Sequence, residues 1–310
     1  MTIALSAKVP LFAAISLLAA CRTRVEPLTR RSVIDADVAF LSSEALAGRA
    51  AGSAGADSAA AFLAQRYEQL GLPPAFRVSC PTAPTCPESY FQSFTLTSGV
   101  GENVGTVIIG SDPLLRKQFV VLGAHYDGLG RSPTFALDRN RGFVIRPGAD
   151  DNASGVAGVL ELARRFRDQP GRRSLLIVNF DAEELGLVGS RVFLDAGAVP
   201  KEAITFMLNL EMIGRLRDNG LFVEGVREKT TRALVDSVVA NAGMRAHYVA
   251  DAGLSDHTSF LATGINAVSL STGNHSDYHK ASDIAGRVNG PGIDRVVDVA
   301  ERILRRSTDR

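Results

Sequence analysis

Short apolar runs alternate with amphipathic stretches along the chain beyond residue 100, and this alternation restricts the possible folds more than any other feature. Strand-like apolar runs occupy residues 119–124, 174–180, 204–210, 220–224 and 267–270. Helix-like stretches, with apolar residues three or four positions apart, occupy residues 154–167, 186–196, 228–242 and 293–306. The alternation predicts an α/β fold with a mostly parallel central sheet and helices on both faces.

The segment before residue 100 is predicted to add a short helical N-terminal lead-in. Helical spacing occurs in residues 33–46 and 56–72, which a glycine-rich turn separates, and strands are expected at 92–98 and 103–110. Because no repeat or long linker interrupts the sequence after residue 100, we expect residues 33–310 to form one α/β domain. The long stretch 129–147 is expected to form a loop at the rim of a site.

Charge and composition exclude several classes of protein. The 34 Lys and Arg residues nearly balance the 33 Asp and Glu residues, which leaves a formal charge of +1. A chain without a basic surplus lacks the electrostatic footprint of a nucleic-acid-binding protein, so no nucleic-acid partner is expected. A hydrophobic content of 45% and a charged content of 22% are those of a folded chain rather than a disordered one.

The N-terminus carries the pattern of an export signal. Residues 9–20 are uncharged and follow Lys8, and this run is too short for a membrane span but suits a signal peptide. The run ends in LAAC at residues 18–21, which resembles the bacterial lipobox, in which the cysteine becomes the first mature residue and carries a lipid. We therefore predict a lipoprotein signal peptide at 1–20, lipidation at Cys21 and a tether at 21–32.

The lipobox resemblance also predicts a location. It implies an exported protein that a lipid anchor alone attaches to the membrane, and it favours the outer membrane, facing the periplasm or the cell surface. Two alternatives remain open, which are a buried N-terminal helix and an ordinary secretory signal whose cysteine is incidental.

The other two cysteines gain a meaning if the chain is exported. Cys80 and Cys86 lie in a proline-rich stretch that suits neither a helix nor a central strand. An oxidising compartment favours a disulfide between them that closes a small loop. A structural zinc site would need a second ligand pair, which this spacing lacks, and two free thiols remain the alternative.

Acidic and imidazole side chains follow the apolar runs in an unusually regular way. Open α/β sheets bind ligands beyond the carboxyl ends of their strands, so residues at those positions are expected to lie close together. Like-charged carboxylates gathered at one edge repel each other, and a divalent cation is the usual remedy. The residues that follow the runs are His125 and Asp127, Asp150 and Asp151, Asp181 with Glu183 and Glu184, Glu211, and His275 with Asp277 and His279.

The ligand types favour zinc. Imidazoles and carboxylates without thiolates suit Zn²⁺, with Mn²⁺ or Co²⁺ as substitutes. Two histidines and three carboxylates are enough for two metal ions if one carboxylate bridges them, and such a pair clamps a hydroxide. Glu183 and Glu184 are adjacent and leave a strand in different directions, so one can bind metal while the other acts as a general base.

Several motifs in order and spacing resemble one known family. They are GAHYDG, GADDNASG, DAEELGLVGS, NLEMIGR, SDHTSF and YHKASD between residues 123 and 283, together with the lead-in LAGRAAGSAG at residues 46–55. This set is similar to the co-catalytic zinc aminopeptidases, which include secreted bacterial leucyl aminopeptidases and glutamate carboxypeptidase. The resemblance implies a zinc exopeptidase fold and two Zn²⁺ ions per chain.

The resemblance also implies a role for individual residues. It assigns one metal to His125 and Glu211, the other to Glu184 and His279, and the bridging position to Asp151. It further implies that Glu183 is the general base, that Tyr278 steadies the oxyanion, and that Asp127 orients the imidazole of His125. Many relatives have Asp where this chain has Glu211, and the extra methylene could shift the spacing of the metals.

The function that the resemblance implies is that of a metal-dependent aminopeptidase. A hydroxide bridging the metals would attack the N-terminal peptide bond of a peptide substrate, with Glu183 taking and returning the proton. One alternative is a glutaminyl cyclase-like enzyme with a single zinc, and another is carboxypeptidase or dipeptidase action on the same scaffold. A noncatalytic lipoprotein that binds metal or peptide is a third, and the oligomeric state is left open.

Overall fold

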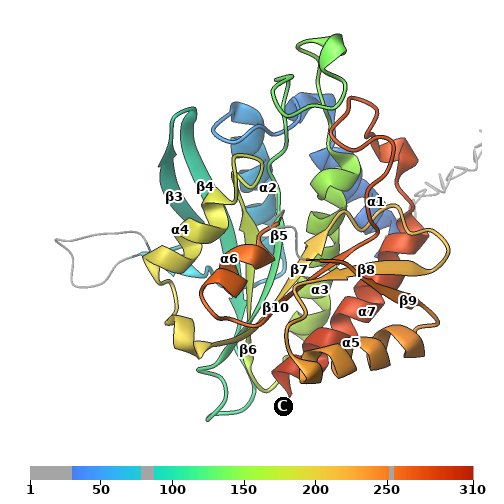
Figure 1. The fold of residues 1–310 in the computed structure, drawn as a ribbon. Helices are drawn as coiled ribbons and strands as arrows, with labels where there is room; N and C mark the ends of the chain where they lie inside the picture. The colour runs from blue at the N-terminus through green and yellow to red at the C-terminus, as the bar shows by residue number, and fades with distance from the viewer. Residues whose placement is uncertain (1–29, 78–86, 251–254, 310) are drawn as a thin grey trace, which may run out of the picture.

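A computed structural model describes residues 30–77, 87–250 and 255–309, and its centre is one eight-stranded sheet (Figure 1). The strands are β3 Phe91–Leu96, β4 Gly99–Ile108, β5 Phe119–His125, β6 Ser174–Phe180, β7 Ile204–Glu211, β8 Gly220–Glu224, β9 Arg245–Tyr248 and β10 Ala267–Ser271. Their order across the sheet is β3-β4-β6-β5-β7-β10-β8-β9. The pairs β6–β5, β5–β7, β7–β10 and β8–β9 are parallel, while the other neighbours are antiparallel.

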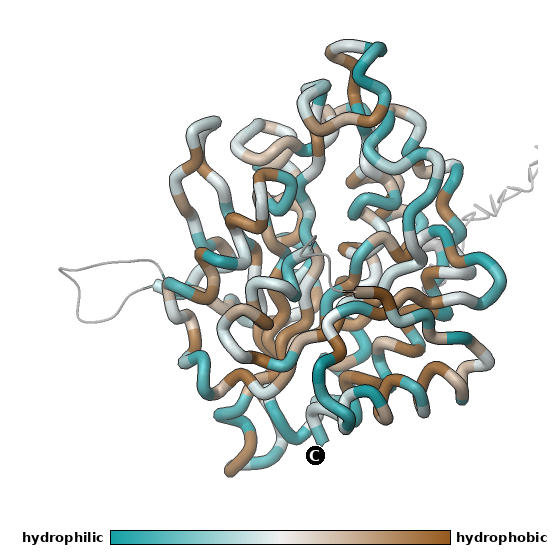
Figure 2. The backbone as a smooth tube through the Cα atoms, in the orientation of Figure 1, coloured by the Kyte–Doolittle hydropathy of each residue, from teal (hydrophilic) through white to brown (hydrophobic). Residues whose placement is uncertain are grey.

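Helices cover both faces of the sheet, as predicted (Figure 1). The larger layer contains α1 Arg30–Leu41, α2 Ala54–Gln69, α3 Gly155–Asp168, α5 Lys229–Asn241 and α7 Gly290–Thr308. The smaller layer contains α4 Val188–Ala196 and α6 His257–Ala262, whose Phe193 and Phe260 pack on Phe180 of β6. Figure 2 shows hydrophobic segments concentrated along the central strands, which both helical layers bury.

The prediction of a mostly parallel α/β sheet with a helical lead-in is confirmed, and the structure adds elements that the sequence pattern did not show. Strand β9 and helix α6 have four and six residues, too few to display a period. Two further short strands, β1 Phe76–Arg77 and β2 Glu88–Ser89, pair outside the main sheet. The unpredicted antiparallel pairing of β8 with β10 places the β8–β9 pair at one end of the sheet.

The winding of the chain reverses at β5, and this reversal locates the site. The chain leaves β5 through α3 to reach β6 on one side, then passes through α4 on the opposite face to reach β7 on the other side. Ligands of open α/β sheets bind at such a switch point, beyond the carboxyl ends of the strands. The last residues of β5 and β6, His125 and Phe180, are paired, and so are the last residues of β7 and β10, Glu211 and Ser271. The carboxyl ends of four strands therefore meet at one edge of the sheet.

Several N-terminal and cysteine predictions lie outside the described residues. They are the signal peptide at 1–20, the lipidation site Cys21, most of the tether at 21–32, and the proposed disulfide between Cys80 and Cys86, all of which stay predictions. Helix α1 begins at Arg30, slightly before the predicted domain start. Within the described ranges, no helix combines the length and the apolar character needed to cross a membrane.

Candidate metal centre

Two imidazoles face one carboxylate at the carboxyl edge of the sheet. The Nε2 atom of His125 lies 3.3 Å from Oδ1 of Asp151, and Nε2 of His279 lies 3.2 Å from Oδ2 of the same residue. Asp151 lies in the turn Ala149–Ser154 that leads into α3, where its φ of −105° and ψ of 91° are not helical, and its side chain is only 7% exposed. The two oxygens of one buried carboxylate thus point at two different rings, as a bridging ligand requires.

Each imidazole also has a second carboxylate. Nε2 of His125 lies 3.3 Å from Oε1 of Glu211, and Nε2 of His279 lies 3.3 Å from Oε2 of Glu184. The structure therefore brings all five predicted ligands together as two overlapping groups, in each of which the ligand atoms lie within 4.8 Å of one another. Asp151 is the member that both groups share.

The electrostatics of these groups fit divalent cations. Burial lowers the pKa of His279, but hydrogen bonds to Asp151 and Glu184 outweigh it and raise the pKa to about 10. Burial likewise lowers the pKa of His125, yet the charges of Glu211 and Glu183 hold it well above its usual value. Without metal, protons on both rings balance the carboxylates, and a bound cation would replace that positive charge.

Asp127 supports both sides of the site. Its Oδ1 atom lies 3.4 Å from Nδ1 of His125, which matches the predicted role of orienting that ring. The same carboxylate accepts hydrogen bonds from the main-chain N–H groups of Glu183 at 3.0 Å and Glu184 at 3.2 Å. One fully buried side chain therefore positions a proposed ligand, a second proposed ligand and the predicted base.

Hydrogen bonds fix the side chain of Glu211, although it is one methylene longer than the Asp of many relatives. While Oε1 faces His125, Oε2 accepts a hydrogen bond from the hydroxyl of Ser255 at 2.6 Å. Asn209 donates in turn to Ser255 at 2.7 Å, so the glutamate is fixed from the strand that carries it. The next residue, Met212, has a φ of 49°, a left-handed conformation that is unfavourable for a side chain of this size.

Glu183 belongs to neither group of ligand atoms and is free to serve as a base. It follows Ala182, whose φ of 57° turns the chain sharply as it leaves β6. Burial raises the pKa of Glu183 well above its usual value, and the neighbouring carboxylates of Glu211 and Asp256 raise it further. A raised pKa suits a carboxylate that accepts a proton and later returns it.

Tyr278 and the loop at 129–147 flank His279. The rings of Tyr278 and His279 stack with centroids 3.9 Å apart. Burial raises the pKa of Tyr278, as do nearby carboxylates including Asp151, so its hydroxyl stays a proton donor. Nδ1 of His279 lies 3.0 Å from the carbonyl oxygen of Phe135 in the loop, and Leu137 donates its N–H to the carbonyl of His279 at 3.0 Å. The predicted rim loop thus directly orients a proposed ligand.

Sequence reasoning noted the glycine-rich lead-in but missed the part played by its arginine. Arg49 is completely buried and donates to the carbonyl oxygens of Tyr126 at 2.7 Å, Pro147 at 2.7 Å and Gly148 at 3.0 Å, and also to that of Leu41. The acceptors Tyr126, Pro147 and Gly148 lie just after His125 or just before the turn that carries Asp151, whereas Leu41 ends α1. The lead-in therefore ties two ligand segments to the helical layer.

Comparison with known sequences decides the family. The sequence profile of Peptidase family M28 matches residues 103–304, which include every proposed ligand. The chain belongs to peptidase family M28. Among curated relatives, the aminopeptidase YwaD of Bacillus subtilis is 28% identical over 193 residues, a region covering 58% of this chain and 39% of that protein. The uncharacterized protein YfbL of Escherichia coli is 27% identical over 212 residues, covering 58% of this chain and 64% of that protein.

Solved structures support the fold of this M28 member. A Zn-dependent exopeptidase from Parabacteroides distasonis has a TM-score of 0.72 at 19% identity, covering 90% of this chain and 98% of that chain. The zinc aminopeptidase BSAP from Bacillus subtilis has a TM-score of 0.71 at 16% identity, covering 92% of this chain and 96% of that chain. The predicted family and fold class are thus confirmed, whereas the matched regions span less than two thirds of the curated relatives YwaD and YfbL.

Replacing Arg49 is expected to destabilise the M28 domain. Arg49→Met leaves buried carbonyls without donors and should lower the free energy of unfolding by about 3 kcal/mol. Arg49→Lys keeps the charge, but one ammonium cannot serve carbonyls on every side, so it should also be destabilised. Urea unfolding of the metal-free protein measures both changes. The exposed Arg141, replaced by Met, is the control, and an equal loss of stability in that variant would contradict this role.

Zinc binding to this M28 domain is expected to release protons at neutral pH. In the metal-free protein His279 has a pKa raised to about 10, so its ring carries a proton that zinc must displace. Zinc affinity should therefore rise with pH up to about 10 and fall as the pH is lowered, because protons then compete more strongly. Calorimetric titration in two buffers with different ionisation enthalpies counts the protons released, and identical heats in both buffers would rule the release out.

Proposed function

We propose that this chain is a zinc-dependent aminopeptidase that removes residues from the N-termini of peptides. The observation that carries the proposal is the pair of ligand groups that share Asp151, with Glu183 beside them but outside both. Family membership supports peptide-bond hydrolysis, and similarity to the aminopeptidase YwaD and the zinc aminopeptidase BSAP favours attack at the N-terminus.

The contacts support a role for each proposed ligand. His125 and Glu211 would hold one zinc ion, Glu184 and His279 would hold the other, and Asp151 would bridge the two. When bound, the two ions would act as Lewis acids toward the scissile carbonyl and would lower the pKa of the attacking water. The buried Asp127 keeps His125 and the 183–184 turn in register, so ligands and base keep a fixed geometry.

The remaining steps belong to the side chains of the protein. Glu183 accepts a proton from the attacking water and delivers it to the leaving amine, for which its raised pKa is suitable. Tyr278, whose ring stacks on that of His279, keeps its hydroxyl proton and donates a hydrogen bond to the oxyanion in this proposal. The loop at 129–147 holds the ring of His279 through the carbonyl oxygen of Phe135, which lies 3.0 Å from Nδ1.

A panel of chromogenic aminoacyl substrates tests the proposal, with zinc content measured on the same preparation. We expect release of the N-terminal residue from free-amine substrates, none from N-acetylated ones, and loss of activity on chelation that zinc restores. If residues are released only from a free C-terminus, the protein is a carboxypeptidase. One zinc per chain together with cyclisation of N-terminal Gln would favour the cyclase alternative, and no release from any substrate would favour a noncatalytic binding protein.

A further inference from the structure

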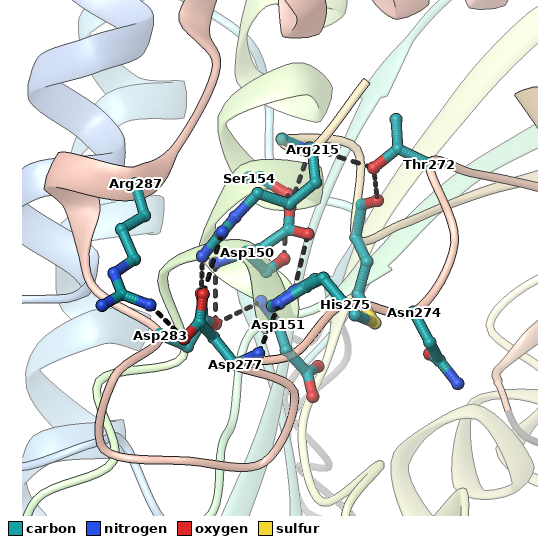
Figure 3. Close-up of polar contacts among 12 residues, drawn as sticks. Asp150, Asp151, Ser154, Arg215, Thr272, Asn274, His275, Asp277, Asp283 and Arg287 are labelled. Carbon is teal, nitrogen blue, oxygen red and sulfur yellow. Dashed lines mark hydrogen bonds and ion pairs between the residues drawn. The ribbon is translucent and has the colours of Figure 1, made fainter. Parts of the chain in front are cut away.

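A network of polar contacts lies behind the two ligand groups and joins the segments that carry Asp151, Glu211 and His279 (Figure 3). Apart from the main-chain N–H of Asp151, the groups that form it belong to residues absent from both ligand groups, and the proposed catalytic steps do not use them. Figure 3 shows their side chains pointing toward one another from the turn before α3, the loop after β7 and the loop after β10.

The centre of this network is the carboxylate of Asp283, which is 2% exposed. Its Oδ2 atom accepts hydrogen bonds from the main-chain N–H groups of Asp150 at 2.9 Å and Asp151 at 3.1 Å. Its Oδ1 atom accepts a hydrogen bond from Nη2 of Arg215 at 2.9 Å. Asp283 is therefore hydrogen-bonded directly to the main chain of Asp151, the ligand that both groups share.

Arg215 links two ligand segments. It lies four residues after Glu211 in the sequence. Its guanidinium donates to Oδ1 of Asp283 at 2.9 Å and to Oδ2 of Asp277 at 3.1 Å. These two aspartates stand on either side of His279 in the sequence. One arginine, 13% exposed, thus clamps the loop that carries His279 to the segment that follows Glu211.

The residues on either side of Asp151 complete the connection. Oδ1 of Asp150 accepts the N–H of Gly214 at 2.6 Å, and Oδ1 of Asn152 accepts the N–H of Met212 at 2.9 Å. Asn152 also donates to the carbonyl oxygen of Leu210 at 2.9 Å. The neighbours of one proposed ligand are therefore bonded to the neighbours of another.

We propose that Asp283 is a positioning residue that fixes the bridging carboxylate of Asp151, and that Arg215 holds Asp283 in place. The inference rests on the proposed function in taking Asp151 as the shared ligand. Because Asp151 presents one oxygen to each imidazole, a rotation of its main chain would move both oxygens at once. Holding its N–H from behind therefore preorganises both metal sites.

The donors around Asp283 give a sharp choice of variants. Asp283→Ala removes the acceptor for the main-chain N–H of Asp151 and is expected to weaken zinc binding about 10- to 100-fold. Asp283→Asn offers one acceptor and one donor to partners that are all donors, so it should also weaken binding. Arg215→Met removes one of those donors. Asp283→Asn should therefore reduce zinc affinity much less in the Arg215→Met background than in the parent.

Competition for zinc between the folded protein and a chelating dye measures the affinity of each variant without reference to turnover. The matched control is Glu161→Gln, because Glu161 is also buried and accepts hydrogen bonds from Arg164 and Arg165, but it lies on α3 away from the ligands. We expect this control to lose stability and to keep the zinc affinity of the parent. Circular dichroism reports whether each variant is folded.

Four outcomes decide the inference. Weaker zinc binding in Asp283→Ala, with the smaller cost of Asp283→Asn in the Arg215→Met background, supports it. Parental zinc affinity in a folded Asp283→Ala variant overturns it. If Asp283→Ala does not fold, Arg215→Met alone decides, because a parental affinity there also overturns the clamp. If the parent releases no amino acid but Asp283→Ala still binds zinc more weakly, the peptidase proposal fails while this positioning role stands.

Discussion

A Glu183→Gln variant is expected to bind zinc as tightly as the parent and to lose turnover by on the order of 10³-fold. Gln has nearly the same shape as Glu, but its amide cannot take a proton from the attacking water. The structure separates this residue from both ligand groups, whereas burial and nearby carboxylates raise its pKa toward the range of a working base. Steady-state kinetics on a leucyl reporter, run with zinc at saturation, gives the change in kcat.

The control for this variant is Glu102→Gln. Glu102 is a partly exposed carboxylate on β4 that accepts a hydrogen bond from Ser93 and lies outside both ligand groups. Its substitution should leave kcat within about twofold, the ordinary effect of a surface change. If the Glu183→Gln variant keeps the turnover of the parent, Glu183 is not the general base. If the variant loses zinc, Glu183 is a metal ligand.

Replacing the shared carboxylate is expected to have the second large effect. Asp151→Asn removes the negative charge and replaces one ligand oxygen by an amide nitrogen, so both zinc ions should bind orders of magnitude more weakly. Glu184→Gln and Glu211→Gln each touch one ligand group and should weaken one zinc ion while the other stays. Zinc content after dialysis at a fixed free zinc concentration distinguishes these patterns.

The number of zinc ions that each variant loses tests whether Asp151 bridges the two sites. If Asp151→Asn loses a single ion and keeps the second, Asp151 serves one site only. If Glu184→Gln or Glu211→Gln loses both ions, the two groups depend on each other in a way that the shared carboxylate does not explain. Each variant should remain folded, because the site lies at the edge of the sheet and not in its hydrophobic core.

The sequence predicted the ligands because chemistry and topology constrain them together. Parallel strands place their following residues at one edge, so His125, Glu184 and Glu211 could be brought together without coordinates. Choosing Asp151 over Asp150 needed the family resemblance, since both follow the same glycine. The structure shows the physical difference: Asp151 faces the two imidazoles, whereas Asp150 accepts from Gly214 and Ser154 behind the site.

The supporting residues were beyond sequence reasoning. Arg49 acts through backbone carbonyls distant in the chain, and carbonyls leave no pattern in a sequence. Asp283 and Arg215 lie within quoted motifs, but their contacts depend on how the loops after β7 and β10 fold against the turn before α3. The contact of Phe135 with His279 likewise depends on a loop conformation that spacing alone does not specify.

Titration of the metal-free protein with zinc, with hydrolysis of a leucyl reporter followed at each addition, tests the central claim most directly. We predict that two zinc ions bind per chain, that activity follows their occupancy, and that the free N-terminal residue is the product. Saturation at one zinc per chain, or two bound ions without release of the N-terminal residue, would contradict a two-metal aminopeptidase.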